Sequence, residues 1–94
     1  MTDRTVCRTP NADGTTSIPS WKYEAVRAAI LDAVGDDGLA FKDLKAAVGE
    51  RLDTDELDRL GSLGWHVTTV KLDMEVAGDI ARVDGVSPQR LVRC

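Results

Sequence analysis

The sequence lacks the long apolar segments that would place a protein in or across a membrane. No apolar run approaches the ~20 residues that a membrane-spanning helix needs, and the first residues lack the apolar stretch of a secretory signal. Only two cysteines are present, Cys7 and Cys94, and a reducing compartment favours two free thiols over a disulfide. We therefore expect a cytoplasmic protein that does not engage a membrane.

The residue combinations that build catalytic and metal sites are also missing. Neither cysteine has a second Cys or a His at metal-ligand spacing. His66 is the only histidine, and Asp73 lies two helical turns away, too far for a hydrogen bond between the side chains. No Ser–His–Asp arrangement surrounds Ser62 or Ser87, and no glycine-rich phosphate loop occurs. The sequence predicts no enzyme, no metal, no cofactor and no small-molecule ligand, and His66 is expected near a helix cap or on the surface.

The residues that are present suit one globular domain with an uneven charge distribution. The 94 residues are 43% hydrophobic and 30% charged, with a formal net charge of −4. Between Ser20 and Asp58 ten acidic residues outnumber five basic ones, whereas five basic residues face four acidic ones from Arg59 to Cys94. An excess of one positive charge attracts a polyanion only weakly.

Composition divides the chain into an N-terminal arm and a folded domain. Residues 1–19 are rich in small polar residues and contain two prolines, so we expect an extended arm or flexible tail. Residues 20–94 are expected to form the domain. Its first helix should be capped by Ser20 and end at Gly35.

Two short helices are predicted in the middle of the chain. A two-residue strand at Leu39–Ala40 should precede a helix over 41–52, where apolar residues recur at helical spacing. Asp53 and Glu56 have the spacing of a capping box, which predicts a brief helix over 54–60. The acidic residues here lack the spacing and central glycine of an EF-hand, so they indicate a helix start rather than a calcium site.

The C-terminal part predicts one long helix followed by a β-hairpin. Ser62 is the expected N-cap of a helix over 63–77, which stops where Gly78 can adopt the left-handed conformation. Two strands should follow within 80–93, joined by a turn at Asp84-Gly85. The order α-β-α-α-β-β, with the brief extra helix, predicts a mostly α winged helix-turn-helix fold.

Two segments, 21–30 (WKYEAVRAAI) and 64–73 (GWHVTTVKLD), carry a resemblance to known proteins. They resemble a family of small bacterial proteins of uncharacterised function, from about Ile18 onward, and this resemblance implies no activity. Residues 67–83 are also similar to the recognition helix and first wing strand of bacterial winged-helix regulators. The aliphatic positions that carry this similarity are Val67, Val70 and Met74. It implies DNA binding by analogy of fold.

The helix predicted over 63–77 carries apolar residues on two nearly opposite sides. One stripe should face the core and consists of Leu63, Val67, Val70, Met74 and Ala77. The other lies next to Thr69 and consists of Trp65, Leu72 and Val76. A DNA-reading helix should present Arg, Lys, Asn, Gln or Ser there instead. The second stripe should be covered by the arm (through Val6 or Ile18), by a second copy, or by a tilt that buries the helix on both sides.

Two functions remain open from the sequence. The first is a transcription-related module that contacts double-stranded DNA through helix 63–77 and the wing at 80–93, using His66, Thr68, Thr69, Lys71, Arg82, Arg90 and Arg93. The second is a protein-interaction or homodimerising domain that does not bind DNA and uses Leu31, Trp65, Leu72 and Val76. The fold favours the first hypothesis, whereas the acidic balance and the apolar side of the helix favour the second.

Overall fold

The protein is mostly helical and carries two small antiparallel sheets. The structure, a computed structural model, describes residues 3–9, 12–83 and 89–93. Within these residues the elements are β1 (Arg4–Thr9), β2 (Ala12–Pro19), α1 (Ser20–Val34), β3 (Leu39–Ala40), α2 (Phe41–Arg51), α3 (Thr54–Leu60), α4 (Leu63–Ala77), β4 (Ile80–Val83) and β5 (Arg90–Arg93). The helices and strands predicted from residue 20 onward are confirmed to within about one residue at their ends. The turn predicted at Asp84-Gly85 lies outside the described residues.

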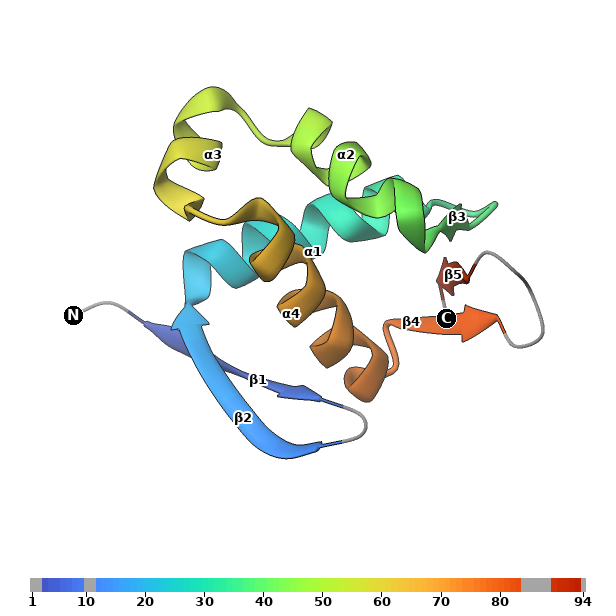
Figure 1. The fold of residues 1–94 in the computed structure, drawn as a ribbon, viewed down its shortest axis with the longest axis horizontal. Helices are drawn as coiled ribbons and strands as arrows, with labels where there is room; N and C mark the ends of the chain where they lie inside the picture. The colour runs from blue at the N-terminus through green and yellow to red at the C-terminus, as the bar shows by residue number, and fades with distance from the viewer. Residues whose placement is uncertain (1–2, 10–11, 84–88, 94) are drawn as a thin grey trace.

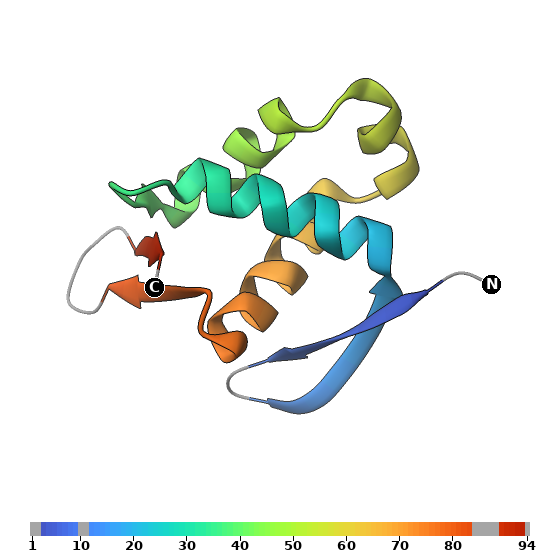
Figure 2. The same cartoon turned by 180° about the vertical axis from the view of Figure 1, so that it is seen from behind.

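Helices α1 and α4 cross at the centre of the fold. Figure 1 shows α4 in front of α1, and the reverse view in Figure 2 shows α1 in front of α4. Val67, Val70 and Met74 of the predicted core stripe are fully buried, as expected. Leu63 is only partly buried and Ala77 is exposed at the end of the helix. The remaining core comes from α1, α2, α3 and the strands, and includes Val26, Ile30, Val34, Leu44, Val48, Leu60, Ile80 and Leu91.

A three-stranded sheet joins the end of α1 to the end of α4. Its strand order is β3-β5-β4, and both pairs are antiparallel. In the register, Leu91 of β5 lies between Leu39 of β3 and Arg82 of β4. Gly38, with φ of 81°, enters β3 so closely that a Cβ atom there would lie 2.7 Å from the Leu91 carbonyl oxygen. Only glycine can occupy this position without moving the strand.

The N-terminal segment forms a β-hairpin that packs along α4. β1 and β2 pair antiparallel, with Cys7 opposite Thr16 and Thr5 opposite Ile18. Cys7 and Ile18 are buried, whereas Val6 is 58% exposed. Of the two arm residues proposed to cover α4, Ile18 therefore lies in the core and Val6 points to solvent. The segment predicted as an arm or tail has a defined antiparallel pairing in this structure.

The start of α1 differs from the sequence prediction. Ser20 is the first helical residue, Pro19 occupies the N-cap position, and no side chain caps the helix. The Ser20 hydroxyl instead shares a hydrogen bond of 2.9 Å with the Thr5 hydroxyl, and the Ser20 amide donates to the Asp3 carbonyl oxygen at 2.8 Å. The prediction that Ser20 caps α1 was wrong because the N-terminal hairpin supplies partners for both Ser20 groups.

The ends of α3 and α4 follow the capping signals of the sequence. Asp53 and Glu56 form the predicted capping box, with the Glu56 amide 2.7 Å from Asp53 Oδ1. Ser62 accepts a hydrogen bond from the Trp65 amide, and Gly78 is left-handed with φ of 86°. These caps fix where α4 begins and ends, and thus which of its residues face solvent. None of the helices in the described residues has the length and apolar character needed to cross a membrane.

Candidate functional site on helix α4

The side of α4 that faces away from α1 carries a row of uncharged side chains. Successive helical residues are rotated by about 100°, so Trp65, Thr69, Leu72 and Val76 lie along one side, which we call the outer stripe. Trp65 is 48% exposed and Val76 is 40% exposed. Thr69 and Leu72 are partly exposed between them. The second stripe lies where the helical period predicted it, but neither the N-terminal arm nor a tilt of the helix covers it, because Trp65 and Val76 remain exposed within the single chain.

The N-terminal hairpin flanks one side of the outer stripe and is joined to α4 through Asp73. The Asp73 side chain is only 4% exposed. Its Oδ1 atom accepts hydrogen bonds from the Arg8 backbone amide at 2.9 Å and from Arg8 Nε at 3.1 Å. Its Oδ2 atom accepts a hydrogen bond of 2.7 Å from the Tyr23 hydroxyl. One buried carboxylate therefore connects β1, α1 and α4.

The pKa shifts around Asp73 follow from burial and from these hydrogen bonds. Burial raises the pKa of the Asp73 carboxyl, but the hydrogen bonds from Tyr23 and Arg8 outweigh it and hold the pKa below its usual value of 3.8. Burial and the hydrogen bond to Asp73 raise the pKa of the Tyr23 hydroxyl. Burial and the charge of Asp73 also raise the pKa of the Cys7 thiol. At neutral pH the cluster thus holds an ionised carboxylate beside a neutral phenol and a neutral thiol.

A second buried ionic cluster flanks the other side of the outer stripe. Lys71 is 2% exposed. Its Nζ atom lies 3.4 Å from Glu75 Oε1 and 4.2 Å from the centre of the Phe41 ring. Arg82 Nε, from β4, lies 3.1 Å from the same Glu75 oxygen. Burial lowers the pKa of Lys71, against the opposing effect of the Glu75 charge. Two cations thus share one carboxylate, and both Glu75 carboxylate oxygens are buried without a hydrogen-bond partner in the part of the chain that the structure describes.

The other residues of the DNA hypothesis divide between core and surface. His66 is buried, and its Nδ1 lies 2.7 Å from the Ser62 carbonyl oxygen, so Nδ1 carries the proton in this bond. Of the two expected positions for His66, near a helix cap or on the surface, the first is confirmed, because the ring binds the carbonyl oxygen of the N-cap residue of α4 and is buried there. Thr68 is exposed. Arg90 donates to the Asp37 carbonyl oxygen at 2.9 Å, and Arg93 pairs with Asp36 at 3.2 Å.

The residues of the partner-interface hypothesis do not all lie together. Trp65, Leu72 and Val76 share the outer stripe of α4. Leu31 belongs to α1, is partly buried and packs against the core. The helical period alone would place Leu31 on the side of α1 opposite its buried residues. Packing of the neighbouring elements covers much of it.

Several residues of this region carry no sequence signal for their role. Arg8 and Tyr23 reach Asp73 from positions 65 and 50 residues away. Phe41 and Arg82 enclose the Lys71–Glu75 pair from α2 and β4. The available hint was that Lys71, Asp73 and Glu75 lie in a helix with apolar residues on two sides, because buried charges require partners.

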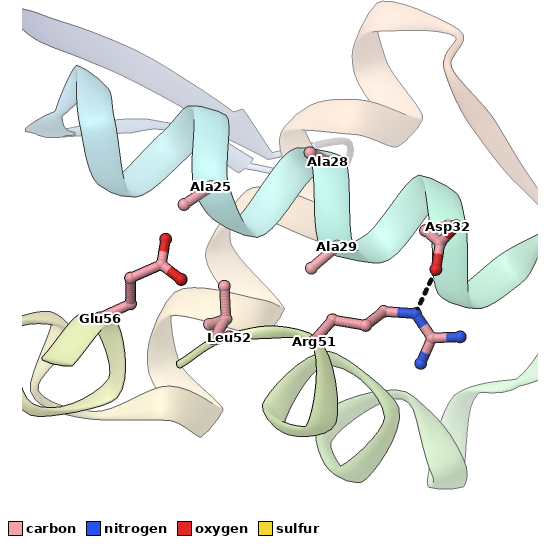
Figure 3. Close-up of a pocket in the computed structure, with 7 residues that line it drawn as sticks. All are labelled: Ala25, Ala28, Ala29, Asp32, Arg51, Leu52 and Glu56. Atoms are coloured by element: carbon pink, nitrogen blue, oxygen red, sulfur yellow. Dashed lines mark hydrogen bonds and ion pairs between the residues drawn. The ribbon is translucent and has the colours of Figure 1, made fainter. Parts of the chain in front are cut away.

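A second concave surface lies between α1 and the segment of α2 and α3. It encloses about 400 Å³ and is lined by Ala25, Ala28, Ala29, Asp32, Arg51, Leu52 and Glu56. Figure 3 shows the Arg51 guanidinium paired with Asp32, at 2.6 Å, while Glu56 also accepts a hydrogen bond from the Asp53 amide. Its charged groups are thus engaged within the chain, and the outer stripe of α4 is the stronger candidate site.

The fold and the outer stripe define a small, mostly helical protein with one accessible apolar helix side and no assembled catalytic group among the side chains described around it. The sequence profile of DUF6958, a family of unknown function, matches residues 4–91. The chain belongs to this family, as the resemblance to an uncharacterised family indicated. The match includes the N-terminal hairpin. No curated protein and no solved structure matches the sequence significantly.

Proposed function

We propose that this protein is a winged helix-turn-helix domain that binds another polypeptide through the outer stripe of α4. The fold supports the proposal because a three-stranded sheet of order β3-β5-β4 lies at one end of α1, α2 and α4 (Figure 1), and β4 and β5 would be the wing strands. In such a domain the helix before the wing carries the contact surface. Here that helix is α4.

The observation that carries the proposal is the chemistry of the accessible side of α4. Trp65 and Val76 are exposed to 48% and 40%, with Leu72 between them. An aromatic side chain of this size buries about 150–250 Å² at an interface. At about 25 cal/mol per Å², covering the exposed half of Trp65 alone contributes roughly 2–3 kcal/mol to binding. Such partly exposed Trp residues are typical energetic centres of protein interfaces.

The charges on α4 do not favour the binding of a polyanionic partner. The helix contains three fully charged residues, Lys71, Asp73 and Glu75, and all three side chains are nearly buried. The cation of Lys71 is compensated by Glu75, so α4 presents no free cation to a phosphate. A polypeptide that offers apolar side chains matches this surface better than DNA does.

The proposal is tested by placing a photo-crosslinking residue at Thr68, which is exposed beside the outer stripe. The full chain is irradiated in the cells that produce it, and covalent polypeptide adducts are resolved by electrophoresis and mass spectrometry. We expect an adduct from Thr68 that disappears in the Val76→Glu background. The same crosslinker at Lys42, which is exposed on α2, serves as the matched control. Absence of adducts at Thr68, or equal adducts at Lys42, would refute the proposal.

A second candidate function, binding of double-stranded DNA, is favoured by the weak pairing of one wing arginine. Arg93 pairs with Asp36, whose side chain is 92% exposed, and such surface pairs contribute about 0–1 kcal/mol. A phosphate could replace Asp36 at little cost, with Thr68 and Thr69 next to the backbone. Arg90, Arg93 and Arg82 would then supply two or three phosphate contacts.

This candidate predicts a shallow salt dependence. With about three phosphate contacts, the slope of log affinity against log salt is about −3. Fluorescence anisotropy of a labelled mixed-sequence duplex, titrated at two salt concentrations, measures that slope. Arg93→Gln should weaken binding, and Arg51→Gln, on α2, should leave it unchanged. Binding that is undetectable at low salt, or equally reduced by both substitutions, excludes the wing as a DNA surface.

A further inference from the structure

We propose that the polypeptide bound by the outer stripe is a second copy of this chain, with the two α4 helices packed antiparallel across a two-fold axis. This inference rests on the proposed function and specifies its partner. In this dimer Trp65 of one copy packs on Val76 of the other, and Thr69 packs on Leu72. The axis passes between Val70 and Lys71, on the outer side of the helix.

The spacing of the outer stripe is self-complementary. Its members follow one another at intervals of four, three and four residues, which is the heptad spacing of a two-helix seam. Reversal of the helix direction reproduces the same intervals. Two copies can therefore place all four positions in contact at once, in a symmetric and closed arrangement of the kind that most homodimers use.

Side-chain size selects the antiparallel orientation. In a parallel pair, Trp65 would face Trp65 and Thr69 would face Thr69, so one layer would be crowded and another would be underfilled. In the antiparallel pair each large residue faces a smaller one: Trp65 faces Val76, and Leu72 faces Thr69. The four layers then have similar volumes along about 16 Å of helix.

Charge also selects this side of the molecule for self-association. Copies with a formal net charge of −4 repel each other, so association is favoured at a surface that exposes few charges. The charges of α4 are buried within the chain, at Asp73 and in the Lys71–Glu75 pair. The acidic excess belongs to 20–58, which contains α1, and Figure 2 shows α1 on the opposite side from α4.

The contact area indicates a weak, concentration-dependent dimer. Two helices that meet over about 16 Å, with some contribution from the flanking hairpin and wing, bury less than the ~1,200 Å² of a stable interface. We therefore expect a dissociation constant on the order of 10–100 µM. Sedimentation equilibrium from about 1 µM to 1 mM should follow a monomer–dimer equilibrium. The Val76→Glu variant should remain monomeric throughout this range, and circular dichroism should show that it is folded.

Disulfide trapping tests the register directly. In a Cys94→Ser background, with the buried Cys7 retained, Trp65→Cys and Val76→Cys proteins are oxidised with diamide separately and as an equimolar mixture. Antiparallel packing brings position 65 next to position 76 of the partner, while like positions are about 16 Å apart along the axis, beyond the reach of a disulfide. We expect covalent dimers in the mixture and almost none in the separate samples. Lys42→Cys mixed with either protein is the control and should remain monomeric.

The possible outcomes separate this inference from the proposed function. Disulfides that form in the separate samples indicate a parallel pair and overturn the antiparallel register. A chain that stays monomeric to about 1 mM, with no disulfide in the mixture, overturns the dimer. If the crosslinker at Thr68 then still yields an adduct with a different polypeptide, the proposed function stands with another partner. If it yields none, both proposals fail.

Discussion

The hydrogen bond from Tyr23 to Asp73 should be one of the more stabilising single contacts in the chain. It is 2.7 Å long and ends on a carboxylate whose side chain is 4% exposed. A hydrogen bond to a charged group contributes about 1.5–3 kcal/mol, because its loss leaves the charge poorly solvated. Tyr23→Phe removes this bond and keeps the ring, so no new cavity contributes to the measured change in the free energy of unfolding. We expect the free energy of unfolding to fall by about 2 kcal/mol.

Urea unfolding followed by tryptophan fluorescence measures this loss. For a domain of this size, about 2 kcal/mol corresponds to a decrease in Tm of roughly 8–16 °C, and to a clear fall in the urea midpoint. Asp79→Asn is the matched control, because it breaks the Arg27–Asp79 pair, whose side chains are 39% and 28% exposed. An exposed pair of this kind contributes at most about 1 kcal/mol.

The effect of Tyr23→Phe should also depend on pH. The pKa of Asp73 in the folded chain lies below its usual value of 3.8. The ionised carboxylate therefore stabilises the fold fully above that usual value, and this stabilisation is lost as the pH falls through the lower, folded pKa. The difference between the native chain and the variant should be largest near neutral pH and shrink in this acidic window. A loss below about 0.5 kcal/mol, or a difference that does not change with pH, would refute the reasoning.

Four single variants and one double variant test the caps and the buried ion pair, each by urea unfolding. Gly78→Ala forces a Cβ into a left-handed position and should lower the free energy of unfolding by about 1 kcal/mol. Gly64→Ala lies inside α4, where its new Cβ would be 3.6 Å from Lys45, and should be neutral or stabilising by up to about 0.5 kcal/mol. A Gly64→Ala variant less stable than Gly78→Ala contradicts this account. Asp53→Ala removes the capping box and should cost about 1 kcal/mol, and an unchanged midpoint would show that α3 does not need the cap. Glu75→Leu leaves Lys71 buried without its carboxylate and should cost about 3–5 kcal/mol, and adding Lys71→Met should recover most of it. If the double variant is no more stable than the single one, the pair is not the cause.

The sequence predicted features that depend on neighbours within a few residues. The capping box at Asp53 and Glu56, the Ser62 cap and the Gly78 stop are local hydrogen-bond and backbone requirements, and all three are confirmed. The presence of apolar residues on two opposite sides of α4 followed from helical periodicity alone, whereas the exposure of the outer one did not. Local rules suffice here because helix ends and helix sides are set by residues within one or two turns.

Features that join distant parts of the chain could not be predicted in this way. Burial of Lys71 depends on Phe41 and Arg82, and burial of Asp73 depends on a hairpin 65 residues away. Serine is a residue type that commonly caps helices, but the Ser20 hydroxyl forms a hydrogen bond with Thr5 of the N-terminal hairpin instead. In each case a polar residue and its hydrogen-bonding or ionic partner come together only in the tertiary fold. No spacing rule in the sequence relates the positions of the two residues. Whether residues 80–93 form a DNA-binding wing stays a prediction.

Asp73 has a consequence for how strands of different molecules meet. The hydrogen bond from the Arg8 amide to Asp73 occupies a group on β1 that would otherwise be open to a new strand. Beside it, Val6 is exposed on a short segment rich in β-forming residues. Neutralising Asp73, by acid or by substitution, uncovers this backbone and offers it to the same segment of another molecule. The carboxylate thereby shields the Arg8 amide from a strand of another molecule, in addition to the packing of β1 along α4.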